Sequence, residues 1–154
     1  MSDSMRIVIG ADHGGFQLKE EIVEYLVSKG HSVSDQGART PDAVDYPDVA
    51  FKVSETVAHS KAELGILICG TGIGMSNAAG KVRGIIPALC TDEYMARMAR
   101  KHNEANVLCM GGRVIGPELA KAIVDAFLEG VPLTDDRYIR RREKITNYER
   151  ALQL

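Results

Sequence analysis

The run of residues 64–69 (LGILIC) limits most strongly how this chain can fold. Every side chain in it is apolar, and the run is too short for an ordinary helix, so it predicts a strand that is buried on both faces. Strands of this kind occur in parallel sheets, because the crossover connections place helices over both faces. The chain is therefore expected to contain a parallel sheet enclosed by helices.

Four other runs also predict short strands, and helical patterns alternate with them. Apolar residues spaced by three and four predict helices between the strands. This alternation is typical of an α/β fold with three αβα layers, a five-stranded parallel Rossmann-like sheet and an extra C-terminal helix. The other strands are predicted at residues 5–10, 31–35, 85–90 and 105–110, the helices at 16–29, 49–59, 75–81, 92–101 and 117–128, and a loop at 36–47.

Length and charge predict one domain that does not bind nucleic acid. The 154 residues fit a single core. The formal net charge is -2, whereas proteins that bind nucleic acid usually carry an excess of basic residues. No stretch approaches the ~20 apolar residues of a membrane span. The short polar segment 1–6 does not resemble a signal peptide, so we expect a cytoplasmic protein that does not enter a membrane.

Polar side chains follow several of the predicted strands. Ligands of open parallel sheets bind at the carboxyl ends of the strands, near the point where the strand order reverses. We expect the side chains after the strands, together with His102 and Asn103 at the end of a helix, to converge on this one edge of the sheet. The residues that end the strands or follow them are Asp12 and His13, Cys69 and Thr71, Thr91 and Asp92, and Arg113 with two preceding glycines.

The loop 70–74 (GTGIG) is rich in glycine but does not have the spacing of a dinucleotide-binding fingerprint. Its unhindered backbone amides suit an anion. Amides close to Cys69 would favour its thiolate and could hold an oxyanion, so this cysteine is a candidate proton-transfer base and Thr71 a candidate proton relay. A cysteine that only packs against the loop is the alternative. Cys90 and Cys109 are predicted to be buried apolar residues, and no metal site is predicted.

Residues 134–154 form an arginine-rich tail with few apolar positions. It is predicted to be a helix. Arg137 and Arg141 are four residues apart, so they share one face of that helix and could hold one anion. The tail is either a solvated surface helix or an arm that reaches a partner subunit.

Five segments of the chain together resemble the signature segments of the type B ribose-5-phosphate isomerases. The resemblance extends from Met5 to about Ile145. It implies a cofactor-free interconversion of ribose 5-phosphate and ribulose 5-phosphate through an enediolate, in a homodimer or tetramer whose subunits share each active site. The segments are residues 10–15 (GADHGG), 45–47 (DYP), 65–74 (GILICGTGIG), 100–103 (RKHN) and 106–113 (NVLCMGGR).

The resemblance also implies a role for each matching residue. Met75 stands where some members carry a glutamate base, which leaves proton abstraction to the cysteine, and Tyr138 stands where many members carry a histidine. The implied roles are Cys69 as the base, Thr71 as the proton relay, Gly70, Gly72 and Gly74 as the oxyanion loop, His102 with Asp12 in ring opening, Tyr46 and Asn103 as sugar contacts, and His13, Arg113, Arg137 and Arg141 as phosphate ligands.

Three other functions are compatible with parts of the pattern. A six-carbon sugar phosphate such as allose or galactose 6-phosphate would require more room near Tyr46. A non-catalytic module for nucleotides or anions would leave the combination of Cys69, Thr71 and His102 without a purpose. A thiol-dependent phosphatase would require an arginine at the end of a CX5R loop, and the sequence after Cys69 has none.

Overall fold

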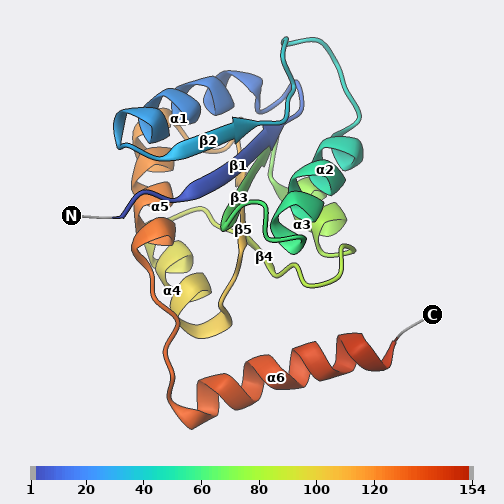
Figure 1. The fold of residues 1–154 in the computed structure, drawn as a ribbon. Coiled ribbons are helices and arrows are strands. Elements are labelled where there is room, and N and C mark those ends of the chain that lie inside the picture. The colour runs from blue at the N-terminus through green and yellow to red at the C-terminus, as the bar shows by residue number, and fades with distance from the viewer. Residues whose placement is uncertain (1–2, 153–154) are drawn as a thin grey trace.

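The computed structural model describes residues 3–152 as an open sheet covered by helices on both faces (Figure 1). The five strands are parallel and lie in the order β2-β1-β3-β5-β4. The strands are β1 (Arg6–Ala11), β2 (Ser32–Asp35), β3 (Leu64–Cys69), β4 (Pro87–Leu89) and β5 (Val107–Gly111). The helices are α1 (Phe16–Ser28), α2 (Tyr46–Ala58), α3 (Ile73–Ala79), α4 (Glu93–Asn103), α5 (Pro117–Glu129) and α6 (Asp136–Ala151).

Alternate side chains of β3 supply two separate cores. Ile66 and Ile68 join the apolar residues of α1, α4 and α5 on one face of the sheet. Leu67 and Cys69 join those of α2 and α3 on the other face. All six residues of β3 are buried, as expected for a strand covered on both sides. The predicted three-layer α/β fold with an extra C-terminal helix is confirmed.

The strand order reverses between β1 and β3. From β1 the chain first adds β2 on one side, then crosses to add β3 on the other side. Asp12 directly follows β1 and Cys69 ends β3, so the two side chains flank this reversal point. Ligands of open α/β sheets bind at such a point.

One loop prediction was wrong at its end. The loop was expected to extend through Pro47, but α2 already begins at Tyr46 with the proline in its first turn. Proline is favoured there because the first helical amides have no partner within the helix. Tyr46 therefore belongs to the start of a helix and not to a loop.

Helix α6 lies apart from the three layers (Figure 1). None of its residues is buried, and its contacts with the rest of the chain are few: its first half meets the end of α4, and the Glu149 carboxylate accepts from the Gly84 amide. This is unusual for a helix of 16 residues, because packing of an apolar face supplies most helical stability in proteins. Within residues 3–152, no helix has both the length and the apolar character that crossing a membrane requires.

Candidate active site

The loops after β1, β3 and β5 interlock at the carboxyl edge of the sheet. The amide of Gly112 donates to the Cys69 carbonyl (2.8 Å), and the amide of Arg113 donates to the Gly70 carbonyl (3.0 Å). A Cβ atom added at Gly111 would lie 2.8 Å from the backbone of Thr71, and one added at Gly14 would lie 2.9 Å from the Gly70 nitrogen. The glycines thus let three backbones approach more closely than other residues would permit.

Cys69 lies beneath this interlocked layer, with 5% of its surface exposed. The Gly72 amide donates to its Sγ atom at 3.1 Å. Gly72 has a φ of +83°, in the left-handed region, and the turn that this φ permits points the amide back at the sulfur. An N–H group forms a stronger hydrogen bond with a negatively charged acceptor than with a neutral one. The loop therefore supplies the contact that a proton-accepting sulfur requires.

The other two cysteines differ from Cys69 in their surroundings. Burial raises the pKa of the Cys90 thiol to about 12, with a smaller contribution from the nearby Asp92 carboxylate. Burial also raises the pKa of Cys109. Both thiols therefore stay protonated near neutral pH, and both are buried, as predicted.

The turn after β1 places a carboxylate beside Cys69. Asp12 is 7% exposed, and its Oδ1 accepts hydrogen bonds from the amides of Gly14 (2.8 Å) and Gly15 (3.2 Å). Its own amide donates to the Ile68 carbonyl, one residue before Cys69. His13, the next residue, is exposed on this edge. The side chain of Asp12 is thus fixed by the turn, and that of His13 is free to meet a ligand.

Arg113 and Tyr46 border the same glycine loop. A Cβ atom added at Gly70 would lie 3.2 Å from Nη1 of Arg113, so the guanidinium lies against the loop backbone. A Cβ atom added at Gly74 would lie 2.6 Å from the ring of Tyr46. Thr71 is exposed, and its Oγ1 accepts from the Ile73 amide at 3.2 Å. The carboxyl edge therefore combines a thiol, a carboxylate, a hydroxyl, a guanidinium and a phenol.

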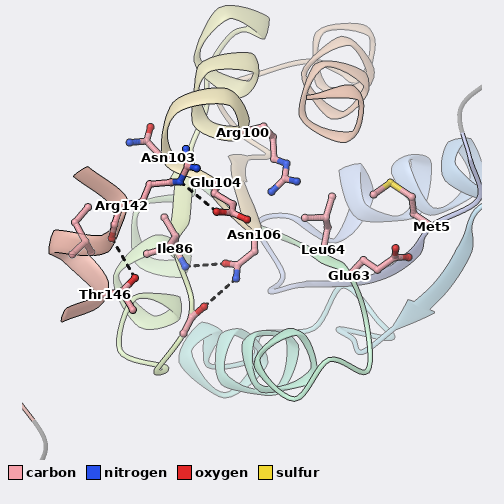
Figure 2. Close-up of a pocket in the computed structure, with 12 residues that line it drawn as sticks. Met5, Glu63, Leu64, Ile86, Arg100, Asn103, Glu104, Asn106, Arg142 and Thr146 are labelled. Atoms are coloured by element: carbon pink, nitrogen blue, oxygen red, sulfur yellow. Dashed lines mark hydrogen bonds and ion pairs between the residues drawn. The ribbon is translucent and has the colours of Figure 1, made fainter. Parts of the chain in front are cut away.

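His102 and Asn103 lie at the opposite edge of the sheet. They form the last turn of α4, and α4 runs back from β4 to the beginning of β5. Asn103 lines a cavity of about 470 Å³ together with Leu64 and Asn106, which stand at the amino ends of β3 and β5 (Figure 2). The expectation that both residues join the carboxyl edge of their own chain was wrong. A helix between parallel strands runs antiparallel to them, so its end returns to the amino edge.

The arginine tail begins at the same amino edge. Arg137 and Arg141 are both exposed on α6, and the ring of Tyr138 stacks on the ring of His102. Arg142 anchors the helix by donating to the carbonyls of His102 (3.3 Å) and Leu133 (3.0 Å). It also pairs with Glu104 at 3.4 Å, as Figure 2 shows. Sequence reasoning missed this anchor, because nothing in the pattern distinguishes Arg142 from the neighbouring arginines.

The predicted site residues thus form two groups in a single chain. The carboxyl-edge group contains Asp12, His13, Tyr46, Cys69, Gly70, Thr71, Gly72, Gly74 and Arg113, and the amino-edge group contains His102, Asn103, Arg137 and Arg141.

Among residues 3–152, no cluster of three or more His, Cys, Asp or Glu side chains could hold a metal ion.

Comparison with known proteins identifies the family. The sequence pattern of the family described as Ribose/Galactose Isomerase matches residues 7–145. The chain belongs to the ribose/galactose isomerase family. It is 47% identical to ribose-5-phosphate isomerase B of Escherichia coli, over 94% of this chain and 96% of the relative. It is 48% identical to D-erythrulose-4-phosphate isomerase of Pectobacterium atrosepticum, over 81% of this chain and 83% of the relative.

A solved member of the ribose/galactose isomerase family has the same fold. Ribose-5-phosphate isomerase B of Clostridium thermocellum superimposes with a TM-score of 0.94 at 47% identity, over 97% of this chain and all of the solved chain. The family resemblance inferred from the five sequence segments is therefore confirmed. Family members act on different sugar phosphates, so membership by itself leaves the substrate of this chain open.

Proposed function

We propose that this chain is an aldose–ketose isomerase that interconverts D-ribose 5-phosphate and D-ribulose 5-phosphate through an enediolate. The hydrogen bond from the Gly72 amide to Sγ of Cys69, at the reversal point of the sheet, carries the proposal. The names of the relatives support the substrate class, and the resemblance to the ribose-5-phosphate isomerase B proteins favours the pentose.

The first step opens the sugar ring. The ring oxygen O4 gains a proton and the hydroxyl at C1 loses one, while the C1–O4 bond breaks and a C1 aldehyde forms. His102 is the proposed proton donor to O4, and the carboxylate of Asp12 assists at the hydroxyl. Asp12 suits this task because two backbone amides already hold its position.

The second step moves a proton between carbons. Cys69 takes the proton from C2, and the electron pair shifts to O1 of the aldehyde. The amides of the loop 70–74 stabilise the negative oxygen, a contribution that is commonly the largest in such reactions. Thr71 then passes the O2 proton to O1, C2 becomes the carbonyl, and Cys69 returns its proton to C1. Substrate and product are isomers, so the scheme consumes no oxidant or reductant.

The separation of the two groups of residues supports a shared site. In one chain His102 and Cys69 lie at opposite edges of the sheet, so ring opening and proton abstraction cannot occur at one bound sugar. We therefore propose a homodimer in which the amino-edge group of one copy faces the carboxyl-edge group of the other. Arg137 and Arg141 of α6 would then hold the phosphate together with His13 and Arg113, while Tyr46 and Asn103 contact the sugar.

Conversion of ribose 5-phosphate to ribulose 5-phosphate by the purified protein tests the proposal. The assay contains EDTA and no added cofactor. Turnover that is lost in Cys69→Ala and kept in Cys109→Ala would support both the reaction and the base. A Cys69→Ala protein with near-normal activity would refute the cysteine mechanism, and a wild-type protein without activity would refute the substrate.

A six-carbon sugar phosphate is the second candidate. The family description includes galactose, and the segment 39–46 beside the site is exposed throughout, so the space next to Tyr46 is open. Catalytic efficiencies for ribose 5-phosphate, allose 6-phosphate and galactose 6-phosphate distinguish the candidates. A clear preference for a six-carbon phosphate would change the substrate and leave the proton-transfer scheme intact.

A further inference from the structure

Tyr138 forms an aromatic stack with His102. The two ring centroids are 4.7 Å apart and the ring planes differ by 13°. Both side chains are partly buried, although most of the surrounding α6 surface is exposed. This contact links the first turn of α6 to the last turn of α4, far apart in the sequence. A stacked imidazole has little freedom to rotate about its terminal torsion, so Tyr138 limits the direction of the ring nitrogens.

The same tyrosine also holds Arg137. Nη2 of Arg137 donates to the phenol oxygen at 3.1 Å, and the guanidinium carbon lies 4.8 Å from the centre of the Tyr138 ring. A guanidinium over an aromatic ring is attracted by the electron-rich face. Tyr138 therefore contacts an imidazole through its ring and a guanidinium through both its ring and its hydroxyl.

The backbone near the stack is fixed as well. Arg142 donates to the carbonyl of His102 and also bonds to the segment that leads into α6. Because the main chain is held in this way, the remaining freedom of His102 lies in its side-chain torsions. The stacked ring is the contact that restricts those torsions.

We propose that Tyr138 is a positioning residue that fixes the His102 imidazole and the Arg137 guanidinium as one unit. This inference rests on the proposed function, in which His102 opens the ring and Arg137 binds the phosphate. Tyr138 does not exchange a proton with the sugar. It sets the direction of the imidazole through its ring, and it holds the guanidinium through its hydroxyl as well as its ring. Removing the hydroxyl alone therefore affects only the contact with Arg137.

Two substitutions separate the effects. Tyr138→Phe keeps the stacked ring and removes the hydroxyl, so kcat for ribose 5-phosphate should stay within about twofold, while the inhibition constant of inorganic phosphate rises about three- to tenfold. Tyr138→Leu removes the flat ring as well, so kcat should also fall about tenfold or more, because a small misplacement of a catalytic group is costly. Tyr138→His, which keeps an aromatic ring, should recover most of the kcat that the leucine variant loses.

Tyr148→Leu is the matched control, because Tyr148 is 68% exposed on the same helix and should leave both constants unchanged. Thermal midpoints and the oligomeric state of every variant are measured alongside. Unchanged kcat in Tyr138→Leu, or an equal loss in the leucine and histidine variants, would overturn the role toward His102. A phosphate constant that is unchanged in both Tyr138→Phe and Tyr138→Leu would overturn the role toward Arg137. If wild type itself does not turn over ribose 5-phosphate, the proposed function fails instead.

Discussion

Two inactive variants should restore activity when their chains pair. Cys69→Ala removes the proposed base at the carboxyl edge, and His102→Ala removes the proposed ring opener at the amino edge. Cys69 at the carboxyl edge aligns with Gly111, the last residue of β5, and β5 begins four residues earlier, at Val107 on the amino edge. At ~3.3 Å per residue, about 13 Å of strand therefore separates the two edges of the sheet. No side-chain contact spans that distance in one chain, whereas a dimer can bring the two edges of different copies together.

The expected recovery follows from the symmetry of the dimer. Each variant by itself should retain about one part in 10² to 10⁴ of the wild-type kcat, since it has lost a proton-transfer group. In a heterodimer of Cys69→Ala and His102→Ala, one site contains both defects and the other contains neither. Random pairing of equal amounts gives heterodimers in half of the molecules, so activity should return to about a quarter of the wild-type value, with the wild-type KM.

The assay mixes the two variants, lets the subunits exchange through denaturation and refolding, and follows ribulose 5-phosphate formation. Cys69→Ala mixed with Thr71→Ala is the control: both residues lie at the carboxyl edge, so no pairing creates an intact site. Activity of the first mixture that stays at the level of the separate variants would refute the shared site. Recovery in the control mixture would refute the assignment of both residues to one edge.

Three further predictions test the carboxyl edge and the core. Iodoacetamide at pH 7.5 should add one label, at Cys69, and abolish activity. Burial raises the pKa of the Cys90 and Cys109 thiols, so both stay protonated at this pH and react slowly. Peptide mass spectrometry locates the label, and labelling of Cys90 or Cys109 before Cys69 would contradict this expectation. Gly111→Ala should lower kcat at least tenfold, because the added Cβ atom would displace the backbone of Thr71 in the glycine loop. Gly116→Ala is the control, because the space around Gly116 is open and kcat should not change. Equal effects of the two substitutions would contradict the interlocking of the loops. Lys19→Met should lower the free energy of unfolding, measured in urea, by about 2–4 kcal/mol, because Lys19 is fully buried and pairs with Asp35. Lys121→Met should lower it by only about 0.5 kcal/mol, because Lys121 pairs with Glu118 at the surface.

The sheet and its carboxyl edge were predictable from sequence, because they depend on local signals. The apolar run of β3 and the alternation with helices predict a parallel sheet, and in such a sheet every residue directly after a strand lies at one edge. The sequence therefore placed Asp12, Cys69 and Arg113 correctly at the carboxyl edge, although it contains no information on the distances between them. The placement of His102 and Asn103 was wrong, although the signal was present: a helix between parallel strands must end at the amino edge.

Other features depend on tertiary geometry that a linear pattern does not contain. The buried Lys19 pairs with Asp35 at 2.7 Å and donates to the Ala38 carbonyl, yet its position in a helical pattern gives no sign of a partner 16 residues away. The stack of Tyr138 on His102 likewise depends on the angle at which α6 leaves the body of the molecule. In the sequence, Tyr138 stands out only as a departure from the histidine that many family members carry, and nothing there indicates its stacking partner.

Helix α6 connects the fold to the proposed assembly. Its 16 residues bury no side chain within the chain, and Ile145 and Leu152 are more than half exposed. An isolated helix of this length is marginally stable in water. The contacts of Arg142 hold its first half, and its second half receives a hydrogen bond from the Gly84 amide at the Glu149 carboxylate (3.3 Å). In the proposed dimer the partner subunit would cover these apolar side chains while receiving Arg137 and Arg141. Stability of the helix and completion of the phosphate site would then have the same cause, so dilution to monomers should weaken both together.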